Sequence, residues 1–254
     1  MLMAMRRSRK KEPSKEKYIL KEKLKIEEGV FDTRTLQRIG KLFGTGIISR
    51  FDFKIATGKE SDIFLVEPGP KVSADILVLK IFRIETTSFR DRLDYILGDT
   101  RFGSVKGNMH AIVDVWCKKE FGNLKLAQST HVNAPEPYAF SGNVLAMEFI
   151  GSDGMPAPQL KNIELKEPEK MLDEIIEQAR RLYAAGLVHA DLSEYNILVK
   201  NNAPYLIDFG QAVVKEHPSA QAFLERDVGN VLTFFKKRYG LAYDLENALA
   251  IITQ

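Results

Sequence analysis

Two acidic motifs in the second half of the chain constrain its fold and chemistry more than any other feature. The first, HADLSEYN, contains Asp191 and Asn196, and the second, IDFG, contains Asp208. Each motif lies beside a short apolar run that is typical of a strand. Carboxylate and amide oxygens are the hard ligands that Mg²⁺ prefers, and Mn²⁺ accepts the same ligands. The motifs therefore predict a metal–nucleotide site with Asn196 and Asp208 as metal ligands.

The order of these motifs resembles the catalytic loop H-R-D-L-x-x-x-N and the D-F-G triplet of protein kinases. In this interpretation Asp191 is catalytic, because it faces the incoming hydroxyl and accepts or orients its proton. Such an effect is typically worth about 10²–10⁴-fold in rate. The alternative is that Asp191 caps a turn and Asp208 ends a strand. The occurrence of both motifs in the right order favours catalysis.

A kinase-like site also needs a lysine upstream, and Lys80 lies in the sequence VLKI of a predicted strand. There its ammonium can reach the α- and β-phosphates of a nucleotide. A strand lysine commonly extends to solvent instead, so its position after two other predicted strands is what favours binding. Glu120, on the following predicted helix, is our candidate for its carboxylate partner, and Asp114 is the rival.

Two further segments are candidates for ATP binding. The turn between the first two predicted strands, TGKES, has one glycine where a phosphate-covering loop usually has three, so amides and hydroxyls must hold the phosphates. The segment after the fifth predicted strand offers the carbonyl of Glu148 and the amide of Ile150 to an adenine edge. The candidates are Thr57, Gly58, Lys59, Ser61, Met147, Glu148 and Ile150.

The pattern of apolar residues predicts an α+β, two-lobed, protein-kinase-like fold. A small antiparallel sheet with one main helix forms the N-terminal lobe, and a truncated, mainly helical C-terminal lobe follows the Pro- and Gly-rich joint GSDGMPAP. The predicted strands are 51–56, 62–67, 75–82, 138–140 and 144–150. The predicted units are a basic tail and helix over 1–44, the N-terminal lobe over 45–150 with a flexible insertion at 83–110, and the C-terminal lobe over 151–254.

Composition excludes several other classes of protein. The single cysteine, Cys117, excludes an internal disulfide and a cysteine-rich zinc site, and it favours a reducing compartment. No apolar stretch approaches the roughly 20 residues of a membrane span, and the start has no secretory signal. We therefore expect a cytoplasmic protein without a membrane partner. Residues 6–17 hold most of the positive excess and either are solvated or contact nucleic-acid phosphates.

More extended motifs resemble the RIO-type atypical serine/threonine protein kinases. The resemblance rests on TGKESDIFLV, HADLSEYN, and IDFGQA followed by the pair Arg226-Asp227, and it extends over roughly residues 45–240. Further matching segments are KIFRIE, YILGDTRF, KKEFGNL and MEFIG. The chain is most similar to the first RIO subfamily, which lacks a winged-helix domain, and to its compact archaeal members.

This resemblance implies an ATP- and Mg²⁺-dependent serine/threonine kinase or ATPase that acts on the pre-ribosomal small subunit and phosphorylates itself. Ser88 and Ser104 are the candidate autophosphorylation sites, and the basic tail is the candidate contact to RNA. The resemblance further implies that Asp208 can carry a transient aspartyl-phosphate. It also implies that Asp227 is a buried acid that braces the catalytic loop, although a surface charge on a helix is the competing interpretation.

The chain also departs from ordinary protein kinases. Ala190 replaces the arginine that would pair with a phosphorylated activation loop, and Ser193 stands where a lysine would face the γ-phosphate. Three alternatives remain at this point. They are a small-molecule phosphotransferase of the aminoglycoside-kinase type, the minimal kinase of tRNA-modification complexes, and a nucleotide-sensing assembly factor without turnover.

Overall fold

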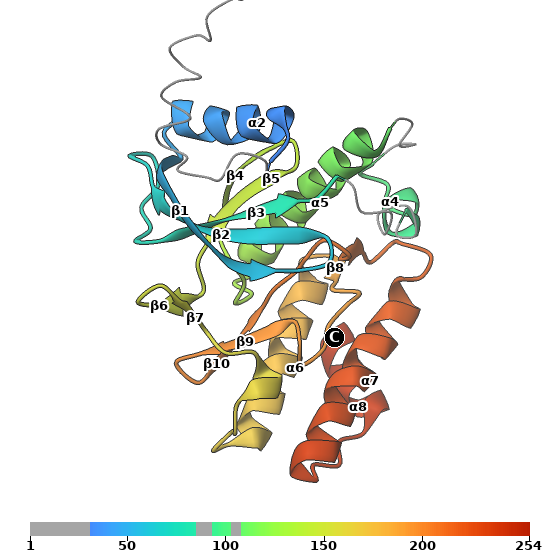
Figure 1. Ribbon diagram of the computed structural model, residues 1–254. Coiled ribbons are helices and arrows are strands. Elements are labelled where there is room, and N and C mark those ends of the chain that lie inside the picture. Colours follow the sequence, from blue (N-terminus) through green and yellow to red (C-terminus); the bar gives the residue numbers. More distant parts are fainter. Residues whose placement is uncertain (1–30, 85–92, 103–107) are drawn as a thin grey trace, which may run out of the picture.

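The computed structural model describes residues 31–84, 93–102 and 108–254. These residues form two lobes, with a β-sheet and two long helices in one and mainly helices in the other (Figure 1). The predicted α+β, kinase-like arrangement is therefore confirmed. None of the helices in the described ranges is long and apolar enough to cross a membrane.

The N-terminal lobe contains a five-stranded antiparallel sheet with the strand order β1-β2-β3-β5-β4. The sequence pattern predicts all five strands to within a few residues at their ends. Strand β3 lies at the centre and is buried along its whole length, which is why its sequence is an apolar run interrupted only by Lys80. The strands are β1 (Ile48–Thr57), β2 (Ser61–Pro68), β3 (Leu77–Phe82), β4 (Pro137–Ser141) and β5 (Val144–Glu148).

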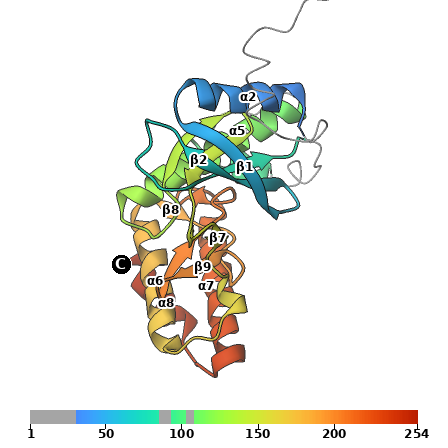
Figure 2. The ribbon, with the colours of Figure 1, turned by 60° about the vertical axis from the view of Figure 1, so that its left-hand side comes forward.

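Two long helices belong to this lobe. Helix α2 (Thr33–Gly44) begins where Asp32 accepts a hydrogen bond from the N–H of Thr35 at 2.8 Å, and it packs its apolar face on the sheet. Helix α5 (Met109–Ser129) follows Asn108, whose side chain accepts a hydrogen bond from the N–H of Ala111 at 3.3 Å. A second view shows α2 on the side of the sheet away from the helical lobe (Figure 2).

Part of the predicted 83–110 insertion also has a defined position. Helix α4 (Asp94–Leu97) packs against the C-terminal lobe, where Tyr95 stacks on Phe223 with ring centroids 5.2 Å apart. The main-chain carbonyl of Asp94 lies 3.1 Å from His217 Nε2. Residues 93–102 therefore connect the two lobes, whereas 85–92 and 103–107 lie outside the described residues.

The C-terminal lobe is built on three helices and three two-stranded sheets. Pro168 occupies the first turn of α6, where its missing N–H costs no hydrogen bond. The helices are α6 (Pro168–Ala184), α7 (Ala220–Tyr239) and α8 (Leu245–Thr253), with the short 3₁₀ helix η1 (Leu160–Asn162). The strand pairs are β6 (Gly151–Ser152) with β7 (Met155–Pro156), β8 (Leu187–Val188) with β11 (Val213–Val214), and β9 (Ile197–Lys200) with β10 (Ala203–Leu206).

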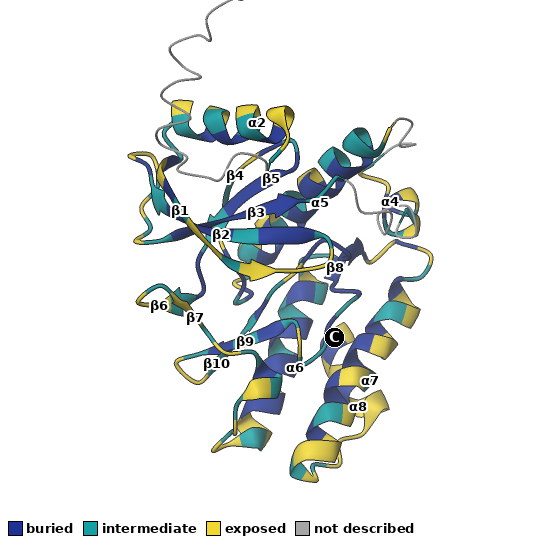
Figure 3. Ribbon diagram, in the orientation of Figure 1, coloured by how far each residue is buried: buried dark blue, intermediate teal, exposed yellow. Residues whose placement is uncertain are grey.

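The hydrophobic core does not divide at the boundary between the lobes. Trp116 and Cys117 of α5 belong to the same buried cluster as Phe209 and Leu187 of the C-terminal lobe, and a smaller cluster lies between α2 and the sheet. Dark blue, buried stretches lie on α5, on β8 and on parts of α6 and α7 (Figure 3). Helix α5 is thus fixed to both lobes, and this position matters for the site.

Candidate active site

A buried ion pair joins the sheet to helix α5. Lys80 Nζ on β3 lies 2.7 Å from Glu120 Oε1 and 2.9 Å from Asp208 Oδ1. Burial alone would lower the pKa of Lys80, but the carboxylates of Asp208 and Glu120 outweigh it and hold that pKa above its ordinary value. Lys80 is therefore a fixed positive charge that connects three separate segments. The predicted pairing with Glu120 is present, and the rival Asp114 pairs with Arg38 instead.

The second acidic motif lies beside the first. Asn196 Nδ2 donates to the main-chain carbonyl of Asp191 at 2.8 Å and to its carboxylate at 3.0 Å. Gln211 Nε2 also donates to Asp191 Oδ2 at 3.0 Å. The N–H of Ile207 donates to the carbonyl of Asn196, so the two predicted metal ligands, Asn196 and Asp208, lie on neighbouring segments. The structure thus brings together the four residues on which the predicted chemistry depends, which are Lys80, Asp191, Asn196 and Asp208.

Two residues of the site have left-handed backbone conformations that side chains rarely adopt. Ala190 has φ of 60° and Asp208 has φ of 65°. Such conformations cost on the order of 1–3 kcal/mol each and persist only where the surroundings hold them. Here Asp227, which is 1% exposed, accepts from the N–H groups of Ala190 at 2.7 Å and Leu192 at 3.1 Å. The predicted bracing of the catalytic loop by a buried acid is therefore confirmed.

His189 is a structural member of the same loop. Its Nε2 lies 3.1 Å from the carbonyl of Ile207, and its ring lies 4.9 Å from the ring of Phe209. Burial lowers the pKa of His189 to about 4, so the imidazole is neutral at physiological pH. A neutral ring donates to Ile207 and links the two motifs without carrying a charge.

A cluster on α5 that the sequence pattern does not predict holds the backbone of the D-F-G segment. Lys119, fully buried, donates through Nζ to the carbonyls of Gly210 at 3.0 Å and Ala212. Asn123 Nδ2 donates to the carbonyls of Phe209 at 2.8 Å and Ala212 at 2.9 Å. The only available signal was that both residues fall inside KKEFGNL, the motif from which Glu120 was chosen. We call Lys119 and Asn123 the α5 clamp.

The α5 clamp continues toward the segment that follows α4. Arg101 donates to Asn123 Oδ1 at 2.7 Å and is itself held by the buried carboxylate of Asp99 through two further bonds. On the other side, Gly210 lies so close to Trp116 that an added Cβ would come 2.6 Å from the indole nitrogen. A glycine is required at this position because the indole leaves no space for a side chain.

The predicted phosphate-covering turn joins β1 to β2. The N–H of Gly58 donates to the carbonyl of Ser61 at 2.8 Å, which closes the turn, and Lys59 is exposed at its tip. The hydroxyl of Thr57 donates to Asp62 Oδ1 at 3.0 Å, so it supports the turn. The phosphate-binding role of the turn stays a prediction.

The predicted adenine-binding segment lies where the chain leaves the sheet. Met147 and Glu148 end β5, and the N–H of Glu148 donates to the carbonyl of Glu136 at 2.8 Å. Ile150 is buried just beyond the strand, and its carbonyl accepts from the N–H of Ala157. The contact of this segment with adenine stays a prediction. The other candidates of the sequence analysis, the tail at 6–17 with Ser88 and Ser104, lie outside the described residues.

Asn196 and Asp208 suit a hard divalent cation. The amide nitrogen of Asn196 is bound to Asp191, which leaves Oδ1 as its ligand atom, and the Asp208 side chain is half exposed. Within the described ranges, no group of three or more His, Cys, Asp or Glu side chains could enclose a metal. The protein thus offers two oxygen ligands, and Mg²⁺ characteristically keeps water and phosphate oxygens in its other positions.

The fold and site together define a protein-kinase-like phosphotransferase with a short helical lobe. The fold matches the crystal structure of the Rio2 kinase–ADP/Mg²⁺–phosphoaspartate complex from Chaetomium thermophilum with a TM-score of 0.68 at 23% identity. That match covers 90% of this chain and 71% of the other. Residues 62–248 match the RIO domain, so the chain belongs to the RIO family.

Curated relatives place the chain in the Rio1 group of this family. It is 41% identical over 217 residues to the RIO-type serine/threonine-protein kinase Rio1 of Haloferax volcanii, covering 85% of this chain and 74% of that protein. It is 45% identical over 168 residues to the Rio1 of Thermoplasma acidophilum, and this match covers 66% of this chain and 88% of that protein. The human serine/threonine-protein kinase RIO1 is 38% identical over 83% of this chain, which spans 37% of the human protein. The predicted family, subfamily and serine/threonine kinase class are confirmed, and the three alternatives are set aside.

Proposed function

We propose that this kinase transfers the γ-phosphate of ATP to serine or threonine hydroxyls in a reaction that requires Mg²⁺. The observation that carries the proposal is the convergence of Lys80, Glu120 and Asp208 beside the hydrogen-bonded pair Asp191 and Asn196. A lysine paired with a helix carboxylate, a metal-binding aspartate and a loop aspartate are the parts that kinase chemistry requires.

Each residue has a separate task in this proposal. Lys80 keeps its charge because two carboxylates flank it, so it holds the α- and β-phosphates by electrostatic attraction. Asp191 accepts or orients the proton of the attacking hydroxyl, and its carboxylate is fixed for that task by Asn196 and Gln211. Asn196 and Asp208 would hold the Mg²⁺, which neutralises phosphate charge when bound.

Two departures lower the expected rate of protein phosphorylation. Ala190 lacks the guanidinium that would sense a phosphorylated activation segment, and its left-handed backbone is instead fixed by Asp227. Ser193 places no cation near the γ-phosphate, so less transition-state charge is balanced. We infer a slow kinase without an activation-loop switch.

ATP hydrolysis through Asp208 is the second candidate reaction. The Rio2 complex from Chaetomium thermophilum contains a phosphoaspartate, and Asp208 of this chain is half exposed and held in a left-handed backbone. In this reaction a carboxylate oxygen of Asp208 attacks the γ-phosphorus, and ADP leaves. Water then cleaves the acyl phosphate to release inorganic phosphate.

We further propose that the chain acts in the cytoplasm on the pre-ribosomal small subunit and phosphorylates itself. Support comes from the resemblance of its motifs to RIO kinases and from the basic run at residues 6–17. Incubating the chain with labelled ATP and purified small-subunit precursors separates the two reactions, because labelled protein and released phosphate are measured independently.

The decisive experiment replaces the loop carboxylate. Asp191→Ala should abolish phosphate transfer and keep ATP affinity within a few-fold, because Asp191 is not a proposed metal ligand. Affinity is measured with a fluorescent ATP analogue, and transfer with γ-labelled ATP. The control is Asp173→Ala, which removes an exposed aspartate of α6. An Asp191→Ala variant that transfers phosphate at the rate of this control would exclude the proposed role.

A further inference from the structure

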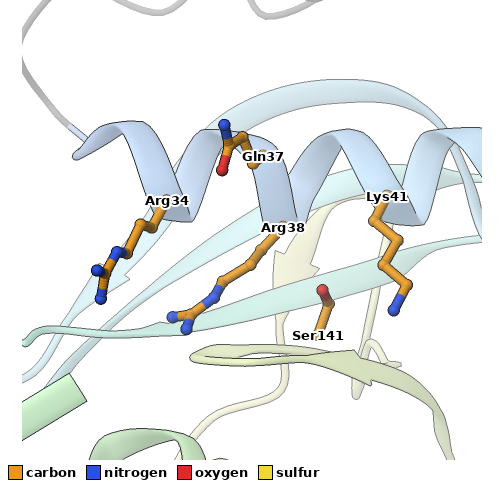
Figure 4. A pocket seen from close by; sticks show the side chains of 5 residues that line it. All are labelled: Arg34, Gln37, Arg38, Lys41 and Ser141. Atoms are coloured by element: carbon orange, nitrogen blue, oxygen red, sulfur yellow. The ribbon is translucent and has the colours of Figure 1, made fainter. Parts of the chain in front are cut away.

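A basic groove lies on the N-terminal lobe, on the side away from the helical lobe. It is a pocket of about 430 Å³ between α2 and the turn that joins β4 to β5, and its lining residues are Arg34, Gln37, Arg38, Lys41 and Ser141. The three cationic side chains leave the same side of α2, and Ser141 lies between Arg38 and Lys41 (Figure 4). We call this pocket the α2 groove.

The central cation of the α2 groove is held in place by the protein. Arg38 donates to Asn143 Oδ1 at 2.7 Å and to Asp114 Oδ2 at 2.6 Å, and its side chain is only 17% exposed. Gly142 has φ of 58° and lies against the guanidinium, so that an added Cβ would come 2.1 Å from Nε. The guanidinium of Arg38 is therefore held in place by Asn143 and Asp114 and lies directly against the main chain of Gly142.

The two outer cations are exposed. Neither Arg34 nor Lys41 forms an ion pair with another residue in 31–84, 93–102 or 108–254. The residues that line the α2 groove include three cations and no carboxylate, and Arg38 is paired with Asp114. The α2 groove therefore carries a net positive charge, and its ligand must be anionic.

The spacing of the cations distinguishes between anionic ligands. Arg34, Arg38 and Lys41 follow one another at successive turns of α2, so they are separated by about 4.5–6 Å along the helix axis. A single phosphoserine reaches one or two such cations, whereas a strand with a phosphate at every unit can contact all three. The sequence preceding the helix adds a further basic run at 6–17.

We propose that the α2 groove binds the phosphodiester backbone of a single-stranded RNA. The choice of RNA over DNA rests on the proposed ribosomal partner, whereas the binding of a polyphosphate strand rests on the groove alone. Contacts go to phosphates and not to base edges, so the groove positions a strand without selecting its sequence.

Fluorescence anisotropy of a labelled 20-nucleotide oligouridine RNA with the full chain tests the proposal, from 50 to 300 mM KCl and without ATP. The variant Arg34→Gln/Lys41→Gln removes the two exposed cations and leaves the bonded Arg38 intact. Its matched control is Lys236→Gln/Lys237→Gln, which removes two exposed cations from the end of α7. Circular dichroism melting verifies that both variants are folded.

We expect the groove variant to bind RNA at least tenfold more weakly at 100 mM salt, with the control close to wild type. The slope of log K against log salt should become shallower by about 1.4, since each contact with a single strand contributes about 0.7. Oligoadenosine should bind as oligouridine does, because the contacts go to phosphates and not to bases. A groove variant indistinguishable from the control, or a phosphoserine peptide that displaces the RNA at equimolar concentration, would overturn the proposal. Because no phosphate transfer is measured, failure here leaves the proposed reaction untouched.

Discussion

Replacing the buried Lys119 should change the stability of the protein in a direction that depends on pH. Burial lowers the pKa of Lys119 to about 7, against an ordinary value of 10.5; Asp99 and Glu120 raise it in part and Arg101 lowers it further. A neutral amine has two N–H groups, and the structure supplies two carbonyl acceptors, those of Gly210 and Ala212. At a pH above the pKa of Lys119 in the folded protein, its neutral amine therefore donates to both carbonyls and no charge is buried.

The magnitude follows from linkage between protonation and folding. Between pH 7 and pH 10.5 the unfolded chain binds the proton that the folded chain has lost, so wild-type stability rises with pH in this window. From pH 6 to pH 9.5 the gain is about 3 kcal/mol. Lys119→Met keeps a similar side-chain volume and does not titrate, but it leaves the carbonyl of Gly210 without its donor, which costs about 1–3 kcal/mol.

The buried charge destabilises the wild type at low pH, whereas the lost hydrogen bond destabilises Lys119→Met at every pH. We therefore expect the curves of unfolding free energy against pH for the two proteins to cross. Near pH 6 the Lys119→Met variant should equal or exceed the wild type in stability, and near pH 9.5 the wild type should be the more stable. Urea unfolding followed by the fluorescence of Trp116, the single tryptophan, reports on the core beside the α5 clamp. Lys118→Met is the matched control, because Lys118 is the exposed neighbour on α5.

If the difference in unfolding free energy between Lys119→Met and the wild type stays constant from pH 6 to pH 9.5, the reasoning is refuted. Such a result would mean that Lys119 is charged throughout this range. The Lys118→Met control should show no such pH dependence. Phosphate transfer by Lys119→Met should fall at every pH, because the D-F-G backbone loses one of its two holders.

Three further substitutions test the site. Asp227→Asn keeps one acceptor oxygen for the two N–H groups of the catalytic loop, so it should lower the free energy of unfolding by about 1–3 kcal/mol, measured in urea, and slow phosphate transfer. Asp208→Asn should remove the Mg²⁺-dependent part of nucleotide affinity, measured with and without EDTA; unchanged affinity would remove the metal assignment. Gly210→Ala drives a methyl group into Trp116, and we expect a loss of about 1–3 kcal/mol in stability together with altered tryptophan fluorescence.

Elements with a local signal were predictable from the sequence. The strands of the N-terminal lobe are apolar runs between turn residues, and α2 has a capping aspartate with an apolar stripe, so neighbouring residues alone define them. The pairing of Lys80 with Glu120 was predictable because a lysine in the third strand needs a carboxylate on the next helix. Choosing Glu120 over Asp114 required the motif, since both are acidic residues of the same helix.

The position of α4 was not predictable in this way. Polar, irregular sequence around it indicated a flexible connection, but Tyr95 and the main chain of Asp94 are fixed by Phe223 and His217. These partners lie more than a hundred residues away along the chain. No periodicity within residues 83–110 encodes them, so only tertiary contacts give this segment its place.

The α5 clamp of Lys119 and Asn123 was not predictable from the sequence for a different reason. A helix that faces a core normally presents apolar side chains, so a lysine and an asparagine on α5 favour solvent exposure. Here Trp116, Lys119 and Asn123 lie at helical spacing on a face that meets main-chain carbonyls, for which N–H donors are the complementary groups. The same helix carries Glu120, the partner of Lys80. A displacement of α5 would therefore break the ion pair of Lys80 and release the D-F-G backbone together, so the phosphate-binding charge and the metal-binding aspartate are assembled or lost as one unit.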